Sequence, residues 1–212
     1  MSGQLQPKEL APPILLFGEY ELRLPLGFDP KDQDQFFRVC QENQPLGLER
    51  TPEGRVSITM PTGGRTGSRN AELTTQLGLW NRQSRAGVVF DSNTGFELPN
   101  NAMRAPDAAW VSRTRLETIT EAQREKFLPL APEFVIELRS DSDRLRPLQA
   151  KLDEYLTAGV ALALLIDPAH RKLYVYRPKT AVMELENPTT FDCSPELPGF
   201  ILELEPIFDP GI

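Results

Sequence analysis

The sequence is poor in the residues on which many metal and nucleophile sites depend. It has two cysteines, Cys40 and Cys193, too few for a disulfide framework or a cysteine-rich zinc site, so we expect free thiols. Its one histidine, His170, lies in a D-P-A-H-R turn, which is typical of a surface position. A single histidine disfavours zinc hydrolases and nucleases built on paired imidazoles. The chain also has no G-x-S-x-G elbow for a serine hydrolase.

Long apolar runs are missing as well. No stretch approaches the roughly 18 to 20 apolar residues that a membrane helix needs. The first ten residues, MSGQLQPKEL, lack the charged and then apolar layout of a signal peptide. We therefore expect a cytoplasmic protein with no membrane partner.

Positive charge is absent from the end of the chain. From residue 180 onward there is no Lys or Arg, and seven acids account for the whole net charge of −7, so residues 1–179 are neutral. A negative net charge argues against nucleic-acid binding, which needs basic residues at the phosphates. Within the neutral part, however, arginines gather in one stretch, which fits a phosphate-facing wall and a solvated surface equally well. They are Arg65, Arg69, Arg82, Arg85, Arg104, Arg113 and Arg115.

Length and composition indicate one domain of many short elements. A chain of 212 residues can form one sizeable core, and its 20 prolines are about twice the usual share. We interpret residues 1–30 as an N-terminal extension with one strand and residues 31–212 as a single α/β domain.

Apolar periodicity predicts helices and strands that alternate along this domain. Helices are expected at 31–44, after the glycine-rich loop of 61–67, within 116–127, and from about 145 to Gly159. Strands are expected in a hairpin at 46–60 and at 87–91, 95–99, 105–112, 133–139, 161–167 and 172–177. The segment 194–208 is apolar enough to pack back as a strand or loop. The loop G-G-R-T-G fits neither a Walker P-loop nor a dinucleotide fingerprint.

Two acids stand in predicted strands. Asp107 lies beside Ala109 and Val111, and Glu137 lies in a strand that is apolar on both faces. An ionised carboxylate buried alone costs several kcal/mol, so each acid needs a cation, hydrogen bonds or a metal. Hard divalent ions such as Mg²⁺ prefer carboxylate and carbonyl oxygens. The alternative is that each acid pairs with an arginine, Arg104 or Arg139, and spacing alone favours this alternative.

A lysine follows on the helix after the Glu137 strand. Lys151 lies near the edge of that helix's buried stripe, so its ammonium can return over the strand end. There it would steady an attacking water and neutralise phosphate charge in a transition state. A lone helix lysine is more often solvated.

Several motifs occur in an order that resembles Uma2-type proteins (DUF820), a restriction-endonuclease branch of the PD-(D/E)XK nuclease superfamily. The resemblance runs from about Val56 to Phe208 and includes a T-G-S-R-N start of a helix and an L-P-G-F near the end. Its main motifs are R-A-P-D-A-A-W-V, A-P-E-F-V-I-E-L-R-S-D-S-D, K-L-D-E-Y-L-T-A-G-V, L-L-I-D-P and K-L-Y-V-Y-R.

The resemblance implies a restriction-endonuclease-like core: a central mixed sheet flanked by helices, here with extra N-terminal and C-terminal strands. It implies an endonuclease that uses Mg²⁺ or Mn²⁺ to hydrolyse nucleic acid, DNA above all. Asp107 and Glu137 would bind metal, with the Leu138 carbonyl and Glu72 as further ligands. Lys151 would be the catalytic lysine, taken from the helix.

One position departs from the superfamily pattern. The (D/E)-x-K motif places lysine two residues after the glutamate, where this chain has Arg139. The alternative function is therefore a catalytically inactive binding or regulatory module with the same fold. Base rates add a homodimer as the expected assembly.

Overall fold

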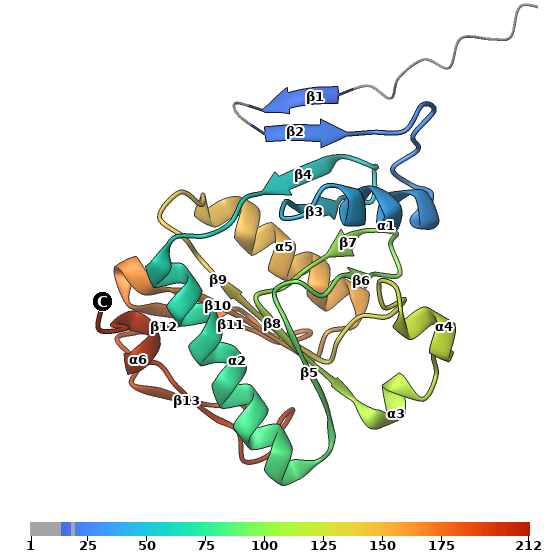
Figure 1. Ribbon diagram of the computed structural model, residues 1–212. Coiled ribbons are helices and arrows are strands. Elements are labelled where there is room, and N and C mark those ends of the chain that lie inside the picture. The colour runs from blue at the N-terminus through green and yellow to red at the C-terminus, as the bar shows by residue number, and fades with distance from the viewer. Residues whose placement is uncertain (1–13, 18–19) are drawn as a thin grey trace, which may run out of the picture.

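The computed structural model describes residues 14–17 and 20–212. Part of the predicted N-terminal extension, residues 1–13 and 18–19, lies outside the described residues. The described part of the extension forms one antiparallel pair, β1 (Ile14–Phe17) with β2 (Tyr20–Arg23). In Figure 1 this pair lies at the end of the molecule where the chain starts.

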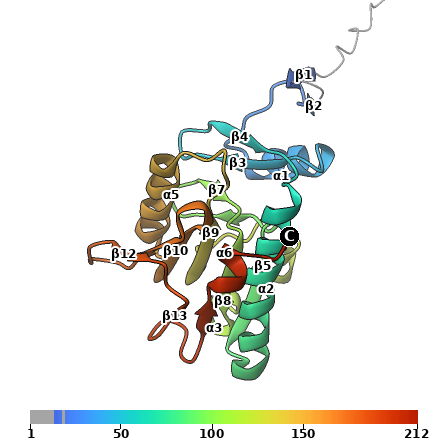
Figure 2. The ribbon, with the colours of Figure 1, turned by 90° about the vertical axis from the view of Figure 1, so that its left-hand side faces the viewer.

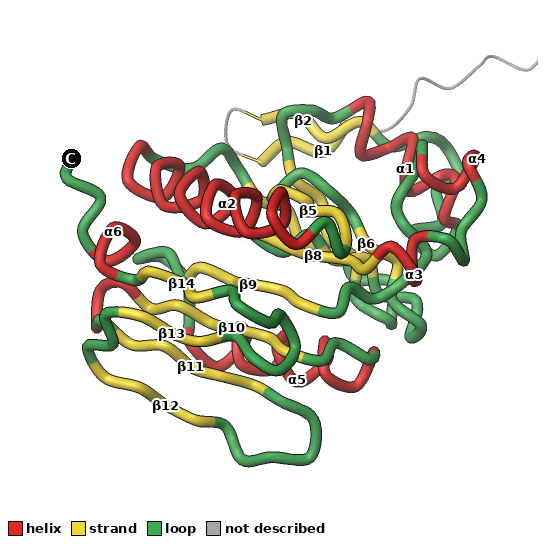
Figure 3. Tube along the Cα trace, turned by 90° about the horizontal axis from the view of Figure 1, so that it is seen from below, coloured by secondary structure: helices red, strands yellow, loops and turns green. Residues whose placement is uncertain are grey.

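A six-stranded mixed sheet forms the centre of the fold, in the order β12-β11-β10-β9-β8-β5. Figure 3 shows these strands in succession from β5, beside α2, to β12. β9 and β10 are parallel, and the other neighbours are antiparallel. The strands are β5 (Gly87–Asp91), β8 (Ala108–Ser112), β9 (Phe134–Leu138), β10 (Leu162–Asp167), β11 (Lys172–Tyr176) and β12 (Met183–Glu186). All residues of β9 and β10 are buried, as their continuous apolar runs predict.

Two long helices cover opposite faces of this sheet (Figure 2). α2 (Gly64–Ser84) buries Leu73 and Leu77 against one face. α5 (Leu145–Ala158) buries Leu152 and Tyr155 against the other and supplies the crossover between parallel β9 and β10. α5 ends where Gly159 adopts a left-handed φ of 104°, the ending that the sequence predicted.

A second, four-stranded sheet adjoins the first, in the order β4-β3-β7-β6. The predicted hairpin of residues 46–60 supplies two of its strands and packs with α1 on a separate small core around Phe36 and Val39. The elements are α1 (Gln33–Glu42), β3 (Gly47–Arg50), β4 (Val56–Thr59), β6 (Phe96–Glu97) and β7 (Met103–Arg104).

The acidic C-terminal segment packs back on the α2 face, as its apolar residues predict. Phe200, Leu202 and Ile207 are buried there. The elements are β13 (Thr190–Asp192), β14 (Ile201–Glu203) and the short helix α6 (Glu205–Phe208). The sequence predicted only a strand or loop, and Glu205-Pro206 instead begins a helical turn, where proline is well tolerated.

The polar stretch of 116–127 is not one helix. Thr120 caps a new helix with a capping box, so that α3 (Arg113–Leu116) and α4 (Glu121–Arg124) are separate. The turn after β10 contains the 3-10 helix η1 (Pro168–His170). No helix of the described residues is long and apolar enough to cross a membrane.

Candidate functional site

The two predicted acids come together at one end of the large sheet. β8 and β9 pair with Ala108 opposite Ile136, and this register, continued by one residue, sets Asp107 opposite Glu137. The backbone N–H of Leu138 donates to Asp107 Oδ2 at 2.7 Å. Asp107 precedes β8 by one residue, so the end of the strand and the pairing with β9 fix its place.

Lys151 reaches this pair from α5, as the sequence predicted. Its Nζ lies 2.8 Å from Glu137 Oε1, and only 14% of the Lys151 side chain is exposed, against 6% for Glu137. One turn further along the same helix face, the Tyr155 hydroxyl donates to Glu137 Oε1 at 2.8 Å. Tyr155 was expected only as a core residue, but its hydroxyl also belongs to the site.

A third carboxylate, from Glu49 in β3, completes the surroundings of Lys151. Glu49 Oε1 lies 2.8 Å from Lys151 Nζ and accepts a hydrogen bond from the Ala105 N–H at 3.0 Å. Arg104 Nη1 lies 3.3 Å from Glu49 Oε2, and its Nε lies 2.6 Å from Glu154 Oε2. Sequence reasoning missed Glu49, because a carboxylate in a short hairpin strand resembles an ordinary surface residue.

α2 contributes Asn70 to the site. Asn70 Nδ2 donates to Asp107 Oδ1 at 3.0 Å. Within the described part of the chain, Asn70 Oδ1 is the buried side-chain atom that has no hydrogen-bond partner. Asn70 had not been predicted, although it stands in the T-G-S-R-N motif.

Glu72, the residue predicted from α2, faces elsewhere. Its Oε1 accepts a hydrogen bond from Gln76 Nε2 at 2.9 Å, and Gln76 in turn binds the backbone of Glu203 in β14. Two residues along a helix point in nearly opposite directions, so Asn70 rather than Glu72 meets Asp107. A metal-binding role for Glu72, and one for the Leu138 carbonyl, stay predictions.

The arginines proposed as alternative partners are engaged with other acids. Arg104 pairs with Glu49 and Glu154, as described above. Arg139 Nη1 lies 2.5 Å from Asp167 Oδ2, at the end of β10. Asp107 and Glu137 are instead held by the Leu138 amide, Asn70, Lys151 and Tyr155, so the arginine-paired arrangement is not the one that forms.

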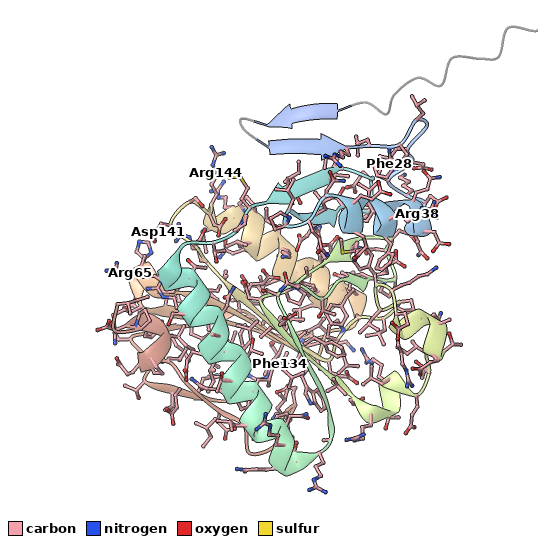
Figure 4. All side chains as sticks on the ribbon, in the orientation of Figure 1. Phe28, Arg38, Arg65, Phe134, Asp141 and Arg144 are labelled. Carbon is pink, nitrogen blue, oxygen red and sulfur yellow. The ribbon has the colours of Figure 1, made fainter. Side chains whose placement is uncertain are left out.

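Several arginines of the 65–115 stretch hold backbone carbonyls. Arg69 Nε donates to the carbonyl of Ile207 at 2.8 Å, and Arg113 Nε donates to that of Arg85 at 2.8 Å. Arg65, in the first turn of α2, and Arg144, directly before α5, lie at the same edge of the molecule in Figure 4. Arg65 Nε also donates to a carbonyl, that of Ile212, at 2.9 Å. Much of the stretch is thus structural, although Arg65 and Arg144 are exposed.

The site carries more negative charge than its one lysine can neutralise. Burial raises the pKa of Glu137 to about 7, and the neighbouring carboxylates of Asp107 and Glu49 act in the same direction, against the opposing effect of Lys151. Burial also raises the pKa of Asp107, while the Leu138 and Asn70 hydrogen bonds oppose this. For Glu49, Lys151 and Arg104 outweigh burial and lower the pKa. Glu137 and Glu49 together raise the pKa of the Lys151 ammonium, although burial alone would lower it.

The residues present suit a hard divalent cation. In the described part of the chain, no group of three or more His, Cys, Asp or Glu side chains is arranged to hold a metal ion. The donor set is instead mixed: carboxylates of Asp107 and Glu137 together with the unpartnered amide oxygen of Asn70. Oxygen donors of this kind are those that Mg²⁺ and Mn²⁺ accept from proteins, usually one or two carboxylates with other oxygens.

An open groove adjoins the site. It has a volume of about 600 Å³ and runs along α2 and β5, where Asn70, Thr74, Gly78 and Arg82 are among its lining residues. Asn70 therefore connects this groove with Asp107.

Comparison with known proteins identifies the family of this chain. Residues 33–205 match the Uma2 family, which is described as "Putative restriction endonuclease". The chain belongs to the Uma2 family. The match spans most of the predicted domain, from α1 to α6, and confirms the resemblance seen in the sequence motifs.

The fold of this Uma2 protein is also similar to that of a solved structure. A crystal structure from Anabaena variabilis ATCC 29413, described as "a putative nuclease belonging to DUF820", is 17% identical, with a TM-score of 0.68. The similarity covers 84% of this chain and 97% of that one. No curated protein matches the sequence. The predicted fold, a mixed sheet flanked by helices, is confirmed, and the family is the one described as a putative restriction endonuclease.

Proposed function

We propose that this Uma2 protein is an endonuclease that uses Mg²⁺ or Mn²⁺ to hydrolyse phosphodiester bonds of nucleic acid, with DNA as the main substrate. The observation that carries the proposal is the placement of Asp107 opposite Glu137, with Lys151 Nζ 2.8 Å from Glu137. A cytoplasmic location and a homodimer are part of the same hypothesis.

In this proposal, each residue has a distinct task. Asp107 and Glu137 would hold the metal, with the Leu138 carbonyl as a further candidate ligand. A divalent metal bound there would supply Lewis-acid activation of water and of the phosphate. Lys151 would donate a hydrogen bond to the attacking water and compensate the charge that develops on the phosphate. Glu49, at 2.8 Å, positions the Lys151 ammonium, and Tyr155 fixes the Glu137 carboxylate.

Arg139 does not replace the lysine of the superfamily motif in this scheme. Its guanidinium pairs with Asp167 at 2.5 Å, and the proposal takes the catalytic ammonium from Lys151 of α5 instead. The alternative, an inactive binding module, predicts that Asp107 and Glu137 serve only to hold Lys151 and the strand ends.

A cleavage assay distinguishes the active endonuclease from the inactive binding module. Purified protein with Mn²⁺ is expected to nick plasmid DNA, and both Asp107→Ala and Lys151→Ala should reduce the rate at least a hundredfold, because metal binding and charge compensation would be lost. Gln83→Ala, at an exposed position of α2, is the control. Cleavage that survives in both Asp107→Ala and Glu137→Ala would contradict the proposal.

A further inference from the structure

Only one of the two polar atoms of the Asn70 side chain has a hydrogen-bond partner among the described residues. Nδ2 donates to Asp107 Oδ1 at 3.0 Å, whereas the buried Oδ1 accepts no hydrogen bond from the described residues. A buried acceptor left without a donor costs about 1 to 3 kcal/mol, and such atoms are rare in folded proteins. This atom also lies beside the candidate metal ligand.

Exchanging Oδ1 and Nδ2 by rotating the Asn70 amide through 180° does not remove the cost of an unsatisfied buried polar atom. With Oδ1 in the place of Nδ2, two acceptor oxygens of Asn70 and Asp107 would face each other, and Nδ2 would lose its acceptor. A cation between the two oxygens removes the repulsion. Asp107 has room for such a contact, because each of its carboxylate oxygens accepts one hydrogen bond, at 2.7 and 3.0 Å, and can accept another partner.

We propose that Asn70 is a metal-site residue, whose amide oxygen binds the divalent cation held by Asp107, or a water in that cation's shell. This inference rests on the proposed function. It assigns to Asn70 the metal contact from α2 that the family resemblance implied for Glu72. The hydrogen bond of Glu72 with Gln76, on the side of β14, is consistent with this assignment.

Binding of Mn²⁺, measured by titration calorimetry on the full chain without nucleic acid, tests the inference. Asn70→Ala is expected to weaken Mn²⁺ binding by about tenfold or more, the usual effect of losing a supporting ligand. Glu72→Gln should leave the affinity within twofold, and Gln83→Ala is the matched control on an exposed position of the same helix. Asp107→Asn should remove binding.

A second variant covers the case in which Asn70→Ala fails to fold. Asn70→Asp keeps the shape and supplies a carboxylate oxygen, so its Mn²⁺ affinity should equal or exceed that of the wild type. Added Mn²⁺ should also raise its Tm more than that of the wild type, because the cation separates two adjacent carboxylates.

The outcomes distinguish the inference from the proposed function. Wild-type affinity in Asn70→Ala, or weaker binding in a folded Asn70→Asp, overturns the role of Asn70 while binding that depends on Asp107 still supports the nuclease. A loss confined to Glu72→Gln overturns it in favour of Glu72. If the wild type shows no Mn²⁺ binding that depends on Asp107, the proposed function itself fails.

Discussion

Two neighbouring parallel strands of the large sheet each carry a buried acid, Glu137 in β9 and Asp167 in β10. The two acids differ in the charged groups that surround them. Glu137 in β9 has Lys151 and Tyr155 as partners and two more carboxylates, Asp107 and Glu49, nearby. Asp167, at the end of β10, is bound by Arg139 and by His170, with Nδ1 of the latter 3.0 Å away.

As a consequence, the pKa values of the two acids shift in opposite directions. The pKa of Glu137 rises to about 7, first because of burial and then because of the other carboxylates. Burial would also raise the pKa of Asp167, but the hydrogen bonds from Arg139 and His170 outweigh it and lower the pKa. The Asp167 pair is thus compensated internally, whereas the Glu137 centre has a surplus of negative charge. Such a surplus is typical of functional sites.

The largest effect is expected from removing the lysine shared by two acids. Lys151→Met would leave the buried Glu137 without its cation and Glu49 with Arg104 alone, and loss of one partner of a buried ion pair costs about 3 to 5 kcal/mol. The free energy of unfolding in urea at pH 7 measures this. Lys172→Met, which removes a partly exposed lysine from the exposed Glu184 and Glu186, should change it little. An equal, small effect of both substitutions would show that the Glu137 centre is no more dependent on its cation than a surface pair.

A smaller effect, visible through its pH dependence, is expected for Glu137→Gln. Since the folded-state pKa of Glu137 is raised, the contribution of Glu137 to wild-type stability should fall as the pH rises from about 4 to above 7. Glu137→Gln lacks this loss, so its stability relative to the wild type should increase by on the order of 2 kcal/mol between pH 5 and pH 8. Denaturation curves at both pH values test this. A constant difference would mean that Glu137 is ionised as easily as an ordinary glutamate.

The smallest effect, with the opposite pH dependence, is expected for Asp167→Asn. The lowered pKa of Asp167 means that its pairing stabilises the protein above the unfolded-state value and is lost as the pH falls through the folded-state value. Because Arg139 is partly exposed, we expect a destabilisation of about 1 kcal/mol at pH 7. The difference should shrink toward pH 2.5. A destabilisation that grows in acid would contradict the assigned sign.

The acids themselves could be predicted because Glu137 stands in a recognisable strand and Asp107 directly before one. Apolar patterning placed Asp107 and Glu137 at strand positions, and the family motifs linked them with Lys151. Spacing alone had favoured arginine partners. Which arginine meets which acid depends on how strand ends and helices converge in three dimensions, and Arg104 and Arg139 went to Glu49, Glu154 and Asp167.

Glu49 and Asn70 could not be predicted in the same way. Glu49 meets Lys151 across 102 positions of sequence, and Asn70 meets Asp107 across 37. Neither residue interrupts an apolar pattern, so no local signal separates it from a surface residue. The same reason explains β12 and β13, whose polar composition gave no strand signal although pairing partners hold them in place.

The sharing of Lys151 between Glu49 and Glu137 also joins the two sheets mechanically. β3 belongs to the four-stranded sheet and β9 to the six-stranded sheet, and one ammonium bridges them. If the proposed cation draws Glu137 toward Asp107, it competes with that bridge, and occupancy of the site would then be transmitted to the hairpin of β3 and β4. Amide hydrogen exchange in the hairpin would then report on an event at the end of β9, without any ligand touching the hairpin itself.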